Sequence, residues 1–178
     1  GVVSPTPTQQ SIIVARCAFF QLDTPITVNR IRWYGVGATT AVYHVAIYRA
    51  SDLVRLTADL NPNTSANAWD AQTVSGGLAM AADTLYFIAV SADTTGATPG
   101  MLAMGPTIAA TTGQIQVLPT SWPGGLDIDA AAPSKVPPAA FAQFTVIAGA
   151  LPDPAGSLAA PAAWTGGMPA LFLDSNAA

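Results

Sequence analysis

The sequence contains no glutamate and only one lysine, Lys135, so aspartate supplies every acidic side chain. Charged residues make up 9% of the chain, whereas a soluble domain usually has about 25%. Because Glu and Lys are the usual residues of solvent-facing helices, their scarcity argues against exposed helices. Ala, Thr, Gly and Pro take their place, with 15 glycines and 15 prolines. This mixture favours many short strands joined by turns.

So little charge is unusual on the surface of a free cytosolic protein. Either much of the surface is buried against partner subunits, which we favour, or it is a neutral surface of Thr, Ser, Gln and Ala. The net charge of −4 and the pI near 4.4 disfavour a nucleic-acid partner, because that role needs a basic patch. No run reaches about 18 apolar residues, so no membrane-spanning helix is expected.

Cysteine and histidine each occur once, as Cys17 and His44. A single cysteine excludes an intrachain disulfide, and one residue of each type cannot form a structural zinc site within one chain. Any Ser-His-Asp or Cys-His device would have to use His44. The pattern places His44 in the middle of a strand and partly exposed, whereas a general base usually lies at the end of an element or in a loop. We therefore predict a non-enzyme, with no catalytic residue, metal site or cofactor.

The stretch 26–50 has the highest density of β-branched and aromatic residues. It reads as two strands, 26–36 and 41–50, joined by a short Gly/Thr turn. Strict alternation would place the apolar residues of the first strand on both faces. A bulge near Asn29 or Arg30 would turn Arg30 or Arg32 outward and bring four apolar side chains to the core: Ile26, Val28, Ile31 and Trp33. In the second strand, one face is assigned to the core and the other, with His44 and Tyr48, to the outside; the core face carries Tyr43, Val45 and Ile47.

The remaining pattern predicts one all-β domain over residues 11–178, an antiparallel, jelly-roll-like β-sandwich. Segment 84–91 is apolar on both faces, so it is either a central strand covered on both sides or a strand with one face in an interface. The other predicted strands are 11–22, 53–57, 69–74, 78–80, 101–104, 108–110, 114–118, 141–147 and 169–174, with a turn at 75–77. Residues 1–10 form an extended N-terminal arm, either a disordered terminus or a strap to a neighbour.

Residues 119–168 are rich in Pro, Gly and Ala and predict long irregular loops; a short helix at 133–142 is the alternative for part of them. Asp127 and Asp129 lie in this region with the spacing of two calcium ligands, but the fuller calcium-loop pattern is missing, so solvated loop acids are preferred.

Aromatic residues beside the loops are the more informative candidates. Trp69, Trp122 and Trp164 lie in or next to loops, and the outward face of strand 41–50 adds Tyr48 and His44. Such side chains anchor protein interfaces or stack on sugars. The alternative is that the tryptophans close the open ends of the sandwich.

Three segments resemble strands of a β-sandwich module found in virion proteins of tailed bacteriophages. They are ITVNRIRWYGVG at 26–37, AVYHVAIYRASD at 41–52 and TLYFIAVSAD at 84–93, and the ending PALFLDSNA at 169–177 resembles the closing strand. The resemblance implies a structural protein of the phage particle: a head decoration or head-fibre protein, or a tail-fibre or tail-tip domain.

Such virion proteins are commonly trimeric, so the implied partners are further copies of the chain and other capsid or tail proteins. The implied location is the extracellular particle, after assembly in the host cytoplasm. Because many of these modules carry lectin-like folds, a carbohydrate-binding, host-recognising module of a fibre is the alternative. A hydrolase built on paired carboxylates or on His44 ranks last.

Overall fold

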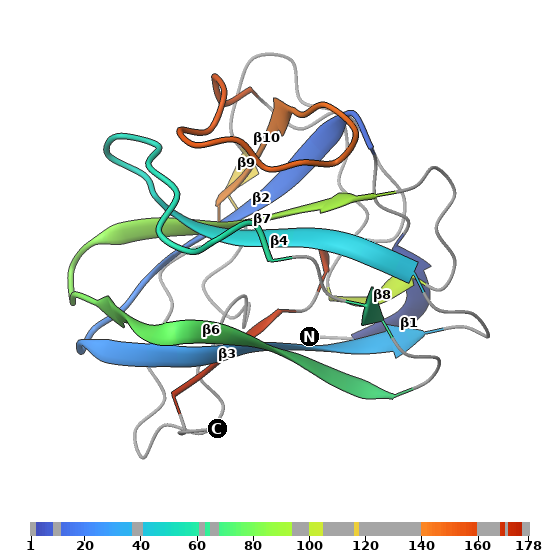
Figure 1. Ribbon diagram of the computed structural model, residues 1–178, viewed down its shortest axis with the longest axis horizontal. Coiled ribbons are helices and arrows are strands. Elements are labelled where there is room, and N and C mark those ends of the chain that lie inside the picture. Colours follow the sequence, from blue (N-terminus) through green and yellow to red (C-terminus); the bar gives the residue numbers. More distant parts are fainter. Residues whose placement is uncertain are drawn as a thin grey trace.

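The computed structural model describes residues 3–8, 12–36, 41–60, 63–64, 68–93, 100–104, 116–117, 140–159, 168–169 and 171–175. Every regular element in these residues is a strand, and the strands form two antiparallel sheets that make a β-sandwich (Figure 1). This confirms the predicted all-β class. The described residues contain no helix of the length and hydropathy needed to cross a membrane.

Six strands form each sheet. Sheet I has the order β1 (Val3–Thr8), β8 (Gly100–Met104), β3 (Ile26–Val36) and β12 (Phe172–Asp174), with β11 (Met168–Pro169) beside β8 and β6 (Trp69–Met80) beside β3. Sheet II has the order β5 (Asn63–Thr64), β4 (Ala41–Arg49), β7 (Leu85–Ala92), β2 (Val14–Gln21), β10 (Ala140–Thr145) and β9 (Gln116–Val117).

The main core lies between the two sheets and is filled by alternate side chains of their long strands. The predicted core face of β4 is confirmed, since Tyr43, Val45 and Ile47 are fully buried there. The facing strands contribute the other large members: Val28, Ile31 and Trp33 from β3, and Tyr86, Ile88 and Val90 from β7.

The predicted irregularity in β3 is present. Val28 pairs with Leu78 of β6 but Arg30 pairs with Thr73, so the register shifts between them and Asn29 lies opposite residues 74–77. The shift lets both Val28 and Ile31 point inward, as predicted.

The turn predicted at 75–77 is wrong, because β6 continues through it from Trp69 to Met80. Gly76 and Gly77 have φ values of 78° and 68°, a conformation that suits glycine and forms a bulge without ending the pairing. A Cβ atom on Gly77 would lie 2.9 Å from the Asn29 and Thr27 side chains, so the close approach of β3 also requires glycine.

The two strands predicted at 26–36 and 41–50 are present as β3 and β4, but they do not pair with each other, and residues 37–40 of the predicted turn lie outside the described residues. β3 pairs with β6, β8 and β12 in sheet I, whereas β4 pairs with β5 and β7 in sheet II. The chain therefore passes from one sheet to the other between these strands. The apolar face of a strand shows that the strand faces the core, but it does not show to which of the two sheets the strand belongs.

β7 is a central strand covered on both sides, which confirms the first of the two predicted alternatives. It lies between β4 and β2, and its outer side chains belong to a second apolar cluster. Residues 146–159, here called the cover segment, pack on this outer face and are drawn in orange above sheet II (Figure 1). The cluster includes Cys17, Phe19, Tyr48, Phe87 and Phe144, with Leu151 and Ala155 from the cover segment.

The cover segment makes the predicted exposure of His44 and Tyr48 wrong. Their face of β4 does point away from the main core, but His44 is 7% exposed and Tyr48 is 0% exposed. The Pro- and Ala-rich sequence after β10 has no strand periodicity, so its packing on this face could not be expected from the pattern.

The structure also tests the predictions for the shorter segments. Residues 53–57 form no strand, and the strand-like pairing in them is limited to one isolated bridge between Arg55 and Tyr48. Residues 3–8 of the expected arm form β1, which pairs with β8 of the same chain. The predicted final strand is present as β12 and pairs with β3. Segments 108–110 and 119–139 lie outside the described residues, and residues 140–142 of the alternative helix belong to β10.

Candidate interaction surface

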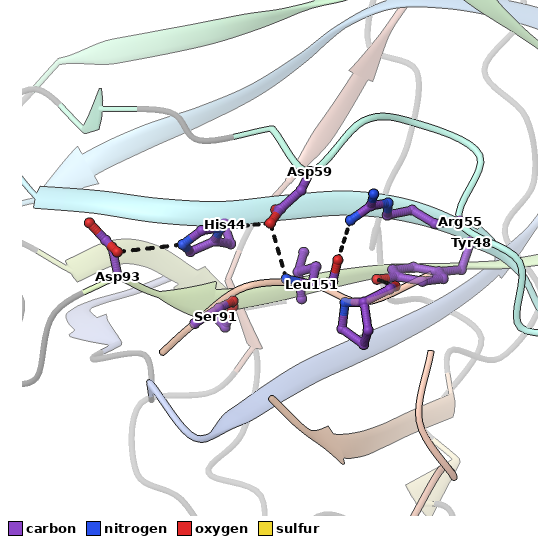
Figure 2. Close-up of polar contacts among 9 residues, drawn as sticks. His44, Tyr48, Arg55, Asp59, Ser91, Asp93 and Leu151 are labelled. Atoms are coloured by element: carbon purple, nitrogen blue, oxygen red, sulfur yellow. Dashed lines mark hydrogen bonds and ion pairs between the residues drawn. The ribbon is translucent and has the colours of Figure 1, made fainter. Parts of the chain in front are cut away.

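His44 lies on β4 beneath the cover segment, between two carboxylates (Figure 2). Its Nδ1 atom is 3.0 Å from Asp59 Oδ2, and its Nε2 atom is 3.6 Å from Asp93 Oδ1. The same Asp59 oxygen accepts a hydrogen bond of 3.1 Å from the backbone N–H of Leu151. Asp59 therefore links the only histidine of the chain to the cover segment.

Further polar contacts fasten the same segment. The Tyr48 hydroxyl donates to the carbonyl of Pro152 at 2.7 Å, and the Arg55 guanidinium donates to the carbonyl of Leu151 (Figure 2). The backbone N–H of Arg55 donates to Asp153 Oδ1 at 3.0 Å. Burial raises the pKa of Tyr48, so its hydroxyl keeps the proton that it donates.

Gly149 brings the cover segment closest to sheet II. The buried Ser91 hydroxyl donates to its carbonyl, and its own N–H donates to the carbonyl of Ile12 at 2.8 Å. Its φ is +77°, and a Cβ atom would lie 2.1 Å from the Ala92 carbonyl oxygen and 2.9 Å from His44 Cδ2. Only glycine fits this position without a shift of the backbone.

Ser91, His44 and Asp59 are the residue types of a catalytic Ser-His-Asp triad. Their geometry is not that of a triad; Ser91 and Asp59 instead bind the backbone of the cover segment. Ser91 is fully buried and uses its hydroxyl to hold Gly149, while His44 Nε2 faces the carboxylate of Asp93. In a catalytic triad the hydroxyl faces Nε2 and is open to substrate. Within the described ranges, no three His, Cys, Asp or Glu side chains are grouped to hold a metal ion.

An exposed aromatic group lies on the opposite side of the molecule, on the outer face of sheet I. Trp69, at the start of β6, is 51% exposed. Its ring centroid is 5.6 Å from that of Phe172 on β12, and the Arg32 guanidinium carbon is 5.9 Å from it. Arg32 pairs with Phe172 across β3 and β12, which places the three side chains on one face. With Arg30, they form what we call the Trp69 surface.

The two arginines of the Trp69 surface share a buried carboxylate. Asp174 is fully buried, with Oδ2 2.7 Å from Arg30 Nη2 and 3.8 Å from Arg32 Nη1. The two arginine side chains are 28% and 32% exposed. The site therefore combines a flat apolar ring with partly exposed cations.

The structure separates the residues that the sequence grouped as candidate contacts. Trp69 is half exposed on sheet I, while His44 and Tyr48 are buried on the far side of the sandwich. Trp122 and Trp164 lie outside the described residues, as do Asp127 and Asp129.

Sequence reasoning missed Phe172 as a member of the Trp69 surface. The predicted bulge already turned Arg30 or Arg32 outward. The sequence did not show that the final strand pairs with β3, and this pairing is what places Phe172 beside Arg32. Comparisons of the chain with protein-family models, with curated proteins and with solved structures found no match to any of the three.

Proposed function

We propose that the protein is a non-enzymatic structural component of a bacteriophage particle, which attaches to capsid or tail proteins through the Trp69 surface. One observation carries the proposal: the chain closes the outer face of sheet II with its own cover segment, but sheet I keeps an exposed tryptophan beside arginine. Trp and Arg are the residues that most often dominate the binding energy of protein interfaces.

Three further features support this role. The chain passes repeatedly between the two sheets, as in a jelly roll, which agrees with the likeness of its strands to phage virion modules. Its low charge suits subunits packed in a symmetric assembly, and we propose a trimer located in the particle. His44 is committed to holding Asp59, which supports a role without catalysis. No role with nucleic acid or membranes is proposed.

Co-sedimentation with purified capsids and with purified tails tests this proposal. Trp69→Ala and Arg32→Ala should each weaken binding by about tenfold or more, the usual effect of removing a dominant contact. Leu85→Ala is the matched control, because Leu85 is also a large exposed apolar residue, 46% exposed, but belongs to β7. Unchanged binding of both surface variants, or an equal loss in the control, would rule out this surface.

A carbohydrate-binding role is the second candidate, and the exposed indole of Trp69 beside a guanidinium favours it. Such a ring stacks on the apolar face of a sugar, and arginine binds its hydroxyl or carboxylate groups. A glycan array probed with the wild-type chain and with Trp69→Ala should show signals that the variant loses. If the wild-type chain gives no signal on the array, the glycan role is excluded.

A further inference from the structure

His44 has a carboxylate at each of its two ring nitrogens (Figure 2). Asp59 Oδ2 is 3.0 Å from Nδ1, and Asp93 Oδ1 is 3.6 Å from Nε2. The second distance is longer than a hydrogen bond, and Nε2 is buried without a hydrogen-bond partner among the described residues. The imidazole, whose side chain is 10% exposed, is therefore held between two acceptors.

The protonation state of the imidazole decides how many of these carboxylates it can bind. A neutral ring has one N–H, so the other nitrogen directs a lone pair at a carboxylate, whichever tautomer is present. The protonated ring has a donor for each carboxylate and a charge opposite to theirs. Burial favours the neutral ring, whereas the two carboxylates favour the charged one.

The cover segment contacts the same group of side chains. The backbone N–H of Leu151 donates to the Asp59 oxygen that faces His44 Nδ1. Gly149 packs on the ring itself, since a Cβ atom there would lie 2.9 Å from His44 Cδ2. Ser91, which is opposite His44 on β7, donates to the Gly149 carbonyl. A change in the contacts of His44 therefore acts directly on residues 149–151.

We propose that His44 makes the closure of the cover segment depend on pH, with the segment bound more tightly when the imidazole is protonated. Histidine is the side chain that ordinarily changes charge between about pH 5 and 8, and His44 is the only one in the chain. The protonated ring makes the additional contact with Asp93, so this contribution is complete at the acid end of the range and is lost as the pH rises. Opening of the segment uncovers the second apolar cluster, which includes Tyr48 and Phe87.

Asp59 and Asp93 are the titratable groups that face His44 from the described elements around it. Asp59 comes from the loop after β4, and Asp93 follows β7. The cover segment has one ionisable side chain, Asp153, which accepts from the backbone N–H of Arg55. Carboxylates ordinarily titrate near pH 4, so a change between about pH 5 and 8 reports on the imidazole.

Hydrogen exchange of the Leu151 amide, measured from about pH 5.5 to about pH 8 and corrected for the pH dependence of exchange itself, tests the proposal. The protection factor should fall by about fivefold across this range, a modest effect because Asp93 is 44% exposed. Nitrogen NMR of the imidazole should show His44 losing its proton over the same range. Protection that stays constant, or that rises with pH, overturns the proposal.

Three variants distinguish the proton effect from a folding defect. Asp93→Asn supplies an amide that can donate to the neutral Nε2, so the protection of Leu151 should no longer fall with pH. His44→Asn keeps a donor near the position of Nδ1 but cannot titrate, so it should also abolish the dependence. Asp52→Asn is the matched control, because Asp52 is 41% exposed and does not face His44, and the dependence should be unchanged. A dependence that persists in either of the first two variants, or that the control also abolishes, overturns the proposal.

This inference is independent of the proposed attachment through the Trp69 surface, which lies on sheet I. Exchange is measured on the isolated chain, and attachment is measured with capsids or tails, so either can fail while the other holds.

Discussion

The outer faces of the two sheets differ in how far the chain covers them. On sheet II, aromatic and apolar side chains lie under residues 146–159. Buried or partly buried hydrogen bonds hold that segment in place: Tyr48 and Ser91 donate to its carbonyls, and Asp59 accepts from its backbone. On sheet I, Trp69 remains half exposed beside Phe172 and Arg32. The difference shows that an apolar outer face does not by itself mark an interface, because the chain can cover it with its own residues. An aromatic residue that stays exposed on the face that the chain leaves uncovered is the more specific indication.

The largest expected effect is on the covered face, at Gly149. Gly149→Ala should lower the free energy of unfolding by about 3 kcal/mol or more, because the new Cβ atom collides with the Ala92 carbonyl and φ is positive. Urea denaturation measures this change. Gly156→Ala is the control: the nearest atoms to its Cβ are 3.8 and 3.9 Å away, so stability should change by less than about 0.5 kcal/mol. Equal effects of both variants would contradict this account of the cover segment.

Loss of the Asp59 carboxylate should have the next largest effect. Asp59→Ala leaves His44 Nδ1 and the Leu151 N–H without their acceptor, at a cost of about 2 kcal/mol. The readout is the labelling rate of Cys17, which lies fully buried in the second cluster and whose pKa is raised by burial, so the native thiol reacts slowly. Labelling should accelerate in the variant.

Asp52→Asn is the control for Asp59, since Asp52 contacts only exposed groups outside the cover segment: it forms an ion pair with Arg49 and accepts a hydrogen bond from the Val54 N–H. This change should leave Cys17 labelling unaltered. If Cys17 in Asp59→Ala reacts as slowly as in the wild type, Asp59 does not hold the cover segment.

Alkaline pH should weaken the main core through Tyr43. Burial raises the pKa of Tyr43 to about 12, from an ordinary value near 10. Between these values the unfolded chain has lost the phenol proton and the folded chain has kept it, so the free energy of unfolding falls as pH rises from about 10 to about 12. Chemical denaturation at several pH values should show a smaller fall in Tyr43→Phe. The same slope in both proteins would exclude Tyr43 as the cause.

The smallest effect on stability is expected on the open face. Trp69→Ala should lower the free energy of unfolding by less than about 1 kcal/mol, because half of the ring is exposed to solvent. Thermal unfolding measures this. Tyr48→Ala, the matched aromatic change on the covered face, should cost about as much as Gly149→Ala, roughly 3 kcal/mol, because the Tyr48 side chain is fully buried. If Trp69→Ala lowered the free energy of unfolding as much as Tyr48→Ala, Trp69 would be a residue that stabilises the fold.

The sequence predicted the strands and their faces better than their partners. Alternation identified Tyr43, Val45 and Ile47 as core residues, and the phase slip near Asn29 predicted the irregular register, since both depend only on local spacing. The sheet to which each strand belongs depends on contacts far along the chain, so the spacing of segments 26–36 and 41–50 could not show that β3 and β4 lie in different sheets. The burial of His44 and Tyr48 could not be foreseen, because the segment that covers them has no periodic pattern. Of the candidate contacts, Trp69 alone is placed on a surface by the described residues.

The passage of the chain from β3 in one sheet to β4 in the other has a consequence for folding during synthesis. β2 pairs with β10, and β3 pairs with β12, so strands made early wait for strands made last. Until then, neither sheet is complete and the apolar face under the cover segment is open to solvent. Pairings this distant in sequence make folding slow. A ribosome-bound chain stalled before residue 140 should therefore bind chaperones. The chaperones should dissociate only after β10 and β12 have left the ribosome.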